Sequence, residues 1–283
     1  MARTGKLFNA LSRRGPHKVL RGDLAFAGLP GVVYTPESGL SLAGVAFGHD
    51  WLTAVDRYLG TLEHLASWGI VAAAPDTERG LAPSASRLAF DLGTTLDIIA
   101  GVRLGPGKIS VHPAKLGVIG HGFGGSAAVL TAAKRQGTNG FVPKAAAAAF
   151  PSIVKPPAEE AATGLHVPGL LLSAPGDPTN LRSNTPGLSR AWEAAVLRVV
   201  SKAKPSGFAE GRRLMRAFGL PGPNRRTQRR VRALLTGFLL YQLTGDKTYR
   251  QFADPDAHLP GTDPLDGPLE PAPAEEKFVA LLK

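Results

Sequence analysis

Short apolar runs that alternate with longer amphipathic runs are the feature that most constrains the fold of this chain. A strand that is apolar on both sides must be covered on both faces, which is typical of parallel sheets flanked by helices. We therefore expect an α/β fold with a mostly parallel central sheet and helices on both faces. The expected strands are 31–36, 42–48, 70–76, 115–120, 144–150, 167–174 and 194–200. The expected helices are 53–69, 86–102, a segment from the turn after 120 through 134, 188–194 and 228–243.

Length and composition predict one main domain with a segment at each end. The chain has 283 residues, of which 43% are apolar, enough for one large core. We expect a basic N-terminal segment over 1–22, an α/β domain over 23–253, and a C-terminal tail rich in proline and acidic residues over 254–283. The chain has no cysteine, so disulfides, a thiolate nucleophile and sulfur-based zinc sites are excluded. No cofactor or metal is expected.

Charge and hydropathy predict a cytoplasmic protein with an anionic partner. The basic N-terminus lacks the apolar stretch of a secretory signal, and the longest apolar run, 233–245, is shorter than the roughly 20 residues that span a bilayer. The net charge is +11, and arginines crowd positions 212–232. A protein partner or an acidic membrane at the inner face would suit this charge. Nucleic acid is disfavoured because few aromatic residues interleave with the basic ones.

The glycine-rich stretch "LGVIGHGFGG", residues 116–125, has two interpretations. Gly120, Gly122 and Gly125 match the G-x-G-x-x-G pattern of dinucleotide-binding turns, but that turn should follow the first strand of its unit, and an acid should end the next strand. Several expected strands precede this turn, and the next one ends at Phe150 and Pro151. The second interpretation is the G-x-S-x-G strand-to-helix turn of serine hydrolases, with Gly122 in place of the serine.

In this second interpretation the chain resembles the α/β-hydrolase fold family, in particular its dienelactone hydrolase and cutinase-like polyester hydrolase branch. The resemblance covers about 31–252 and rests on ordered landmarks: "AFGHDW", "HLASWGIVAAAPDT", the glycine turn, "LLLSAPGD" and "VLRVVSKAKPSGF". It implies that the backbone amides of His49 and Phe123 form an oxyanion hole. It also implies that Asp177 is the triad acid and that Pro205 stands at the histidine position.

Two of the three implied triad positions cannot perform their chemistry. Gly122 has no atom that attacks a carbonyl, and Pro205 has no group that moves a proton. The resulting hypothesis is a catalytically degenerate hydrolase that acts as a ligand-binding, scaffold or partner-docking protein, on lipid, acyl or ester-like compounds or at a membrane surface.

Two alternatives remain at this point. One is an active ester or lipid hydrolase with relocated residues, in which Ser126, His258 or His49 converges with Asp177. The other is a nucleotide-dependent protein built on the glycine turn. His121, at the variable position of the turn, is expected beside the central strand and near the pocket, and Asp50 is expected to cap a turn.

Overall fold

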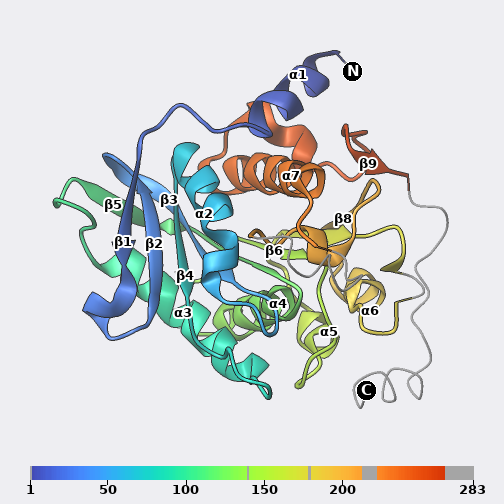
Figure 1. Ribbon diagram of the computed structural model, residues 1–283, viewed down its shortest axis with the longest axis horizontal. Helices are drawn as coiled ribbons and strands as arrows, with labels where there is room; N and C mark the ends of the chain where they lie inside the picture. The colour runs from blue at the N-terminus through green and yellow to red at the C-terminus, as the bar shows by residue number, and fades with distance from the viewer. Residues whose placement is uncertain (1, 139, 178–179, 212–221, 265–283) are drawn as a thin grey trace.

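The computed structural model describes residues 2–138, 140–177, 180–211 and 222–264, and its centre is a nine-stranded sheet (Figure 1). The strands are β1 Val19–Asp23, β2 Gly31–Pro36, β3 Gly39–Gly48, β4 Ile70–Pro75, β5 Ile109–His121, β6 Ala145–Ala149, β7 Gly169–Ser173, β8 Ala195–Val200 and β9 Thr262–Asp263. Their order is β1-β2-β4-β3-β5-β6-β7-β8-β9. Six neighbouring strands pair in parallel, in the order β4, β3, β5, β6, β7 and β8, whereas β1, β2 and β9 pair antiparallel. The expected α/β fold with a mostly parallel sheet is confirmed.

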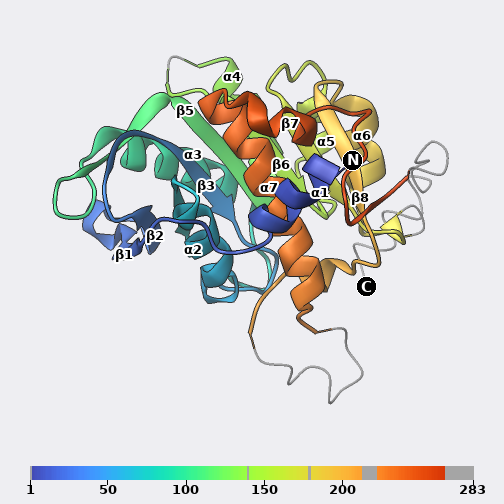
Figure 2. The same cartoon turned by 90° about the horizontal axis from the view of Figure 1, so that it is seen from above.

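Helices cover both faces of this sheet (Figures 1 and 2). The helices are α1 Ala2–Leu11, α2 Leu59–Ser67, α3 Ala85–Gly101, α4 Phe123–Gln136, α5 Ala158–Ala162, α6 Thr185–Ala191 and α7 Arg225–Thr244. The short 3-10 helices are η1 Leu24–Ala27, η2 Val55–Tyr58, η4 Pro205–Gly207 and η6 Lys247–Phe252. One buried cluster joins the sheet to α1, α2 and α7, and the other joins it to α3, α4, α5 and α6.

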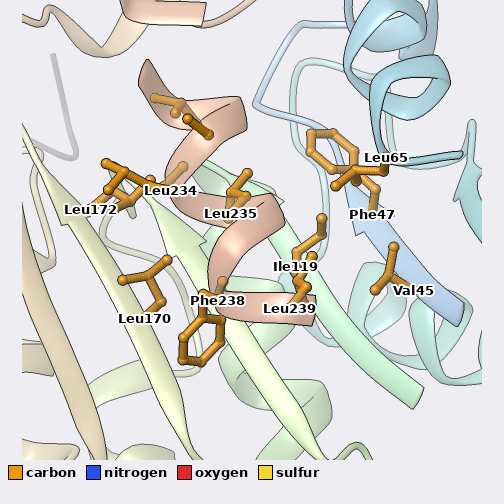
Figure 3. Close-up of a cluster of buried hydrophobic side chains, with 14 of the residues drawn as sticks. Val45, Phe47, Leu65, Ile119, Leu170, Leu172, Leu234, Leu235, Phe238 and Leu239 are labelled. Carbon is orange, nitrogen blue, oxygen red and sulfur yellow. The ribbon is translucent and has the colours of Figure 1, made fainter. Parts of the chain in front are cut away.

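Successive side chains of the central strands divide between the two cores, because side chains alternate across a strand. Leu170 and Leu172 of β7 pack with α7, whereas Leu171 between them packs in the opposite core. Figure 3 shows Leu234, Leu235, Phe238 and Leu239 of α7 lying on the side chains of β3, β5 and β7. This burial on both sides explains why the strands are apolar along their whole length.

The N-terminal segment 1–22 contains two elements that pack on the domain. Phe8 and Leu11 of α1 are buried in the same core as α7, and α1 lies beside α7 in both views of the fold (Figures 1 and 2). The following β1 spans Val19–Asp23 and pairs with β2, so the expected boundary at residue 22 falls inside a strand.

The beginning of the expected C-terminal tail also contacts the domain. The guanidinium group of Arg198 donates hydrogen bonds to the carbonyl oxygens of Asp254 and Pro255, Leu259 is fully buried, and β9 extends the sheet. The rest of the tail, 265–283, and the arginines at 212, 213 and 216 lie outside the described residues. No helix in the described part of the chain combines the length and the apolar character needed to cross a bilayer.

His64 of α2 couples the stability of this core to pH. Burial lowers the pKa of His64 to about 3, the positive charge of Arg232 acts in the same direction, and the backbone of Leu11 opposes both. Its Nε2 atom is buried and has no hydrogen-bond partner among the described residues. The unfolded chain, with a histidine pKa near 6.5, binds this proton first when the pH falls. Protonation of His64 therefore leaves the free energy of unfolding unchanged above pH 6.5. It lowers that free energy progressively as the pH falls from 6.5 toward 3, because only the unfolded chain binds the proton in this range.

We predict that His64→Gln weakens the acid sensitivity of the fold. The unfolded variant lacks the proton-binding site that His64 provides in the unaltered chain. The slope of unfolding free energy against pH should therefore fall by up to about 1.4 kcal/mol per pH unit between pH 6 and 4. Urea unfolding at a series of pH values measures this slope. His17→Gln is the control, because His17 is exposed. An unchanged slope in His64→Gln would contradict a neutral buried imidazole.

Candidate functional site

The glycine turn forms a sharp connection between the central strand β5 and helix α4. Strand β5 ends at His121, and α4 begins at Phe123. Gly122 between them has φ 53° and ψ −118°, a conformation that residues with a Cβ rarely adopt. Its amide donates to the carbonyl oxygen of Ala149 over 2.9 Å, which ties the turn to the end of β6. This strand-turn-helix context is the one that the resemblance implies for the turn, which we call the elbow.

Three further glycines bring the first turn of α4 against the sheet. A Cβ on Gly120 would lie 2.1 Å from the carbonyl oxygen of Gly124, and a Cβ on Gly124 would lie 2.3 Å from the carbonyl group of Gly48. These contacts join β3, β5 and α4 through backbone atoms alone. Any side chain at these positions would push the helix away from the strand ends.

The carboxylate of Asp50 occupies the space that a side chain on residue 122 would need. A Cβ built on Gly122 would lie 2.0 Å from Oδ1 of Asp50 and 2.3 Å from its Cγ. Oδ1 accepts hydrogen bonds from the backbone amides of Phe123, at 2.9 Å, and Trp51, at 2.8 Å. Two backbone amides, one from the loop after β3 and one from the start of α4, thus converge on one carboxylate oxygen.

These two amides correspond only in part to the sequence-based expectation. Phe123 supplies one amide, as its place after the turn suggests. The second amide that reaches the oxygen is that of Trp51, in the loop after β3, two residues after His49. Asp50 was expected to cap a turn, but its carboxylate bonds to the amide of the next residue, Trp51, which is not a capping bond. Its bond to Phe123 is the feature that sequence reasoning missed, because no local pattern shows that residues 50 and 123 meet.

His121 lies in a buried aromatic cluster beneath the turn. Its Nδ1 is 2.7 Å from the hydroxyl oxygen of Tyr58, which also accepts from the amide of Asp50. The imidazole contacts the rings of Phe150 and Phe208 edge to face, with centroids 6.0 and 5.1 Å away. The Tyr58 hydroxyl therefore connects His121 to the Asp50 loop. Sequence reasoning placed His121 beside the central strand but did not anticipate Tyr58.

Burial keeps this cluster uncharged. It lowers the pKa of His121, while the charge of Asp50 and the backbone of Pro205 act in the opposite direction. Burial and the charge of Asp50 raise the pKa of Tyr58 well above its ordinary value. Nε2 of His121 is buried without a hydrogen-bond partner among the described residues, so the backbone of Pro205 is close to the ring without forming a well-aligned bond. We infer that a neutral imidazole accepts from the Tyr58 hydroxyl.

His49 is fully buried and holds the loops after β3 and β4 together. Its Nδ1 is 2.9 Å from the carbonyl oxygen of Asp50, and its Nε2 is 2.7 Å from the carbonyl oxygen of Thr77. Both ring nitrogens therefore face backbone carbonyl oxygens of the two loops.

Asp177 lies after β7, at the position that the resemblance implies for a triad acid. The carboxyl group is buried, and its Oδ2 accepts from the Ser173 hydroxyl at 3.0 Å, the Ala174 amide at 2.9 Å and the Thr185 hydroxyl at 3.1 Å. Burial raises its pKa, and these hydrogen bonds lower it. The bonds that define its environment thus come from its own loop and from α6.

Pro205 follows β8 and begins the short helix η4. Proline suits the first helical position because its φ is already helical and no amide is needed there. The same loop places Phe208 against His121 and Tyr58, with ring centroids 5.1 and 6.0 Å apart. The loop expected to deliver a histidine therefore reaches the elbow, where it contributes backbone and an apolar ring.

The two candidate replacement residues lie in different environments. Ser126 is fully buried in α4, and its hydroxyl donates to the carbonyl oxygen of Ser152. His258 is exposed in the segment between η6 and β9. No hydrogen bond in the described part of the chain joins either residue to Asp177 or to His49.

Comparison with known proteins adds no family assignment: no protein-family model matches the chain, and neither does any curated protein. Among residues 2–138, 140–177, 180–211 and 222–264, no group of three or more histidine, aspartate or glutamate side chains could hold a metal ion.

We predict that Gly122→Ala costs more stability than its backbone conformation alone explains. A side chain at positive φ costs about 1–3 kcal/mol, and here it must also displace the Asp50 carboxylate from two amides. Gly245→Ala is the control for a positive φ alone, since Gly245 has φ 75° and ψ 12° with no atom within 4 Å of a built Cβ. The double-mutant cycle that follows separates the Asp50 contact from the difference in ψ. Urea unfolding should give Gly122→Ala an additional loss of about 2 kcal/mol or more.

A double-mutant cycle isolates the contact. In the Asp50→Ala background the additional cost of Gly122→Ala should disappear, because the atoms that a Cβ would meet are gone. Equal costs of Gly122→Ala in the two backgrounds would show that Asp50 does not occupy this space.

Proposed function

We propose that the chain is a catalytically degenerate α/β-hydrolase-fold protein that docks on a partner instead of hydrolysing esters. The order of its landmarks supports this assignment: an amide-bearing loop follows β3, the elbow follows β5, an acid follows β7, and a loop after β8 returns to the elbow. Active members of this fold use a nucleophile, an acid and a histidine in that chain order.

The single observation that carries the proposal is the carboxylate of Asp50 beneath the elbow. A hydrolase needs an attacking oxygen at residue 122 and two free amides for the oxyanion that forms. Here residue 122 is glycine, its side-chain space holds Oδ1 of Asp50, and the same oxygen accepts from the amides of Phe123 and Trp51. The protein's own anion thus takes the place of both the nucleophile and the oxyanion.

This occupancy also favours docking over binding of an acyl or ester-like ligand at the elbow. Such a ligand would have to displace an anion that already holds two backbone amides. Charge-assisted hydrogen bonds of this kind are among the stronger ones in proteins. A surface role, on a protein or an acidic membrane, requires no such displacement.

An active hydrolase with relocated residues remains the second candidate, on the evidence that Asp177 keeps the acid position. The Ser126 hydroxyl is already engaged by the carbonyl oxygen of Ser152, and His258 is exposed, so neither residue favours this candidate. It predicts ester turnover that Ser126→Ala or His258→Ala abolishes.

We predict that placing a reactive serine at residue 122 also requires removal of the Asp50 side chain. The unaltered protein should not react with a fluorophosphonate probe, which labels activated serines. Gly122→Ser with Pro205→His should label no faster, because the Asp50 carboxylate competes with the added serine side chain for the same space. Adding Asp50→Gly should increase the labelling rate by about 100-fold, the contribution of one oxyanion donor. Time-resolved mass spectrometry measures the adduct.

Two results would contradict the assignment. Rapid labelling of the double variant would show that Asp50 does not block the site. A folded triple variant that stays unlabelled would remove the support for Gly122 and Pro205 as the nucleophile and histidine positions. Circular dichroism and thermal unfolding establish that each variant is folded.

A further inference from the structure

Exposed apolar side chains project from the edge of the sheet at which the elbow lies. Parallel strands β3 and β4 both end at this edge. The loops that follow them expose Trp51, Leu52 and Leu81, which are 46%, 55% and 83% accessible to solvent. The two loops are tied together, because the amide of Val55 donates to the carboxylate of Asp76 over 3.1 Å. Large apolar side chains at loop tips contribute nothing to the core.

Basic side chains lie at the same edge. Strand β8 runs parallel to β7 and ends there, and it is followed by the exposed Lys202 and Lys204. Helix α7 also begins there, since the amide of Asn224, its first capping residue, donates to the carbonyl oxygen of Gly207 over 2.9 Å. The first two turns of α7 expose three arginines: Arg225, Arg226 and Arg229.

The apolar loops and the arginines are connected by η2. The amide of Glu210 donates to the carbonyl oxygen of Arg57 in η2 over 2.7 Å, and the Arg57 guanidinium lies over Gly211. Gly211 and Arg225 line the same surface hollow. These contacts connect residues 55–57, which follow the Trp51 loop, to Arg225 at the start of α7.

The exposed basic side chains at this edge form no ion pairs among the described residues, and the exposed Asp56 of η2 is an acid at the same edge. No described acid forms an ion pair with Lys202, Lys204 or the three arginines of α7. Glu210, the nearest acid along the chain, is engaged by Arg232, Thr61 and the amide of Gly60.

The arginines also oppose the dipole of α7, whose first turn has no acidic residue. Cations near a helix N-terminus reduce helix stability. Folding therefore does not account for them, whereas binding to an anionic surface does.

We propose that this edge docks on an anionic lipid membrane. Trp51, Leu52 and Leu81 enter the interfacial region, where tryptophan is favoured, and the lysines and arginines contact headgroup phosphates. Apolar tips on separate loops, with cations beside them, fit a deformable lipid surface better than they fit a protein, which needs a contiguous packed patch. This inference rests on surface residues and not on the proposed loss of hydrolysis, so the two can fail independently.

The test is flotation of the full chain with vesicles of phosphatidylcholine, and with vesicles of phosphatidylcholine and phosphatidylserine in about a two-to-one ratio. Binding is expected only to the anionic vesicles, and it should weaken as added salt shortens the Debye length from about 8 Å to about 3 Å. The triple variant Arg225→Gln, Arg226→Gln, Arg229→Gln should bind on the order of 100-fold more weakly, at about five-fold for each cation.

Matched controls come from the opposite edge of the sheet. Arg103, Lys108 and Lys144 are exposed and precede the parallel strands β5 and β6, so replacing all three with glutamine makes the same charge change at the other end. This variant should bind as the unaltered protein does. For the apolar tips, Leu81→Ser should weaken binding, whereas Leu40→Ser, at the start of β3 and 63% exposed, should not.

Three outcomes would overturn the proposal. They are equal binding to neutral and anionic vesicles, an equal loss in the two triple variants, and no vesicle binding at low salt. In the last case, a defined protein complex that is lost only with the α7 triple variant would reassign this edge to a protein partner. The labelling experiment on Gly122 and Asp50 is unaffected by any of these results.

Discussion

The close approach of α4 to the ends of β3 and β5 is the constraint on which the rest of the site depends. Gly48, Gly120 and Gly124 meet through backbone atoms, at separations that leave no room for a Cβ. This contact places the amide of Phe123 beside the loop that follows β3. Without it, the carboxylate of Asp50 could not accept from the amide of Phe123 or lie beside Gly122.

The Asp50 carboxylate gives this site its chemical character. One oxygen holds the amides of two loops and fills the side-chain space of Gly122. Tyr58 and His121 extend the same network into the core, where burial keeps the imidazole neutral and the phenol protonated. The conformation at residue 122 and the hydrogen bonds of Asp50 are therefore interdependent, because a side chain on residue 122 would need the space that the carboxylate fills.

Elements with strong periodicity could be predicted from the sequence, and weaker ones could not. The strands from β2 to β8 and helices α3, α4 and α7 fall within a few residues of their expected bounds, except that β5 begins earlier, at Ile109. Helix α2 begins later than expected, at Leu59, because the 3-10 helix η2 takes up the start of the predicted range. Helix α1 and strand β1 were not expected, since their apolar residues are separated by arginines and small residues. Each is stabilised by a distant partner: α1 by α7, and β1 by β2. Local pattern carries no information about such partners.

The amino-acid sequence by itself determined the α/β class, the glycine turn between β5 and α4, and the absence of a nucleophile at residue 122. These follow from residue type and periodicity, which are local properties. Only the tertiary structure decided what occupies the space beside Gly122, because residues 50 and 122 are far apart in the chain and meet through the packing of three backbone segments. The tertiary structure likewise decided that the Ser126 hydroxyl donates to a backbone carbonyl oxygen and that His258 is exposed to solvent. Residue type alone gives neither result.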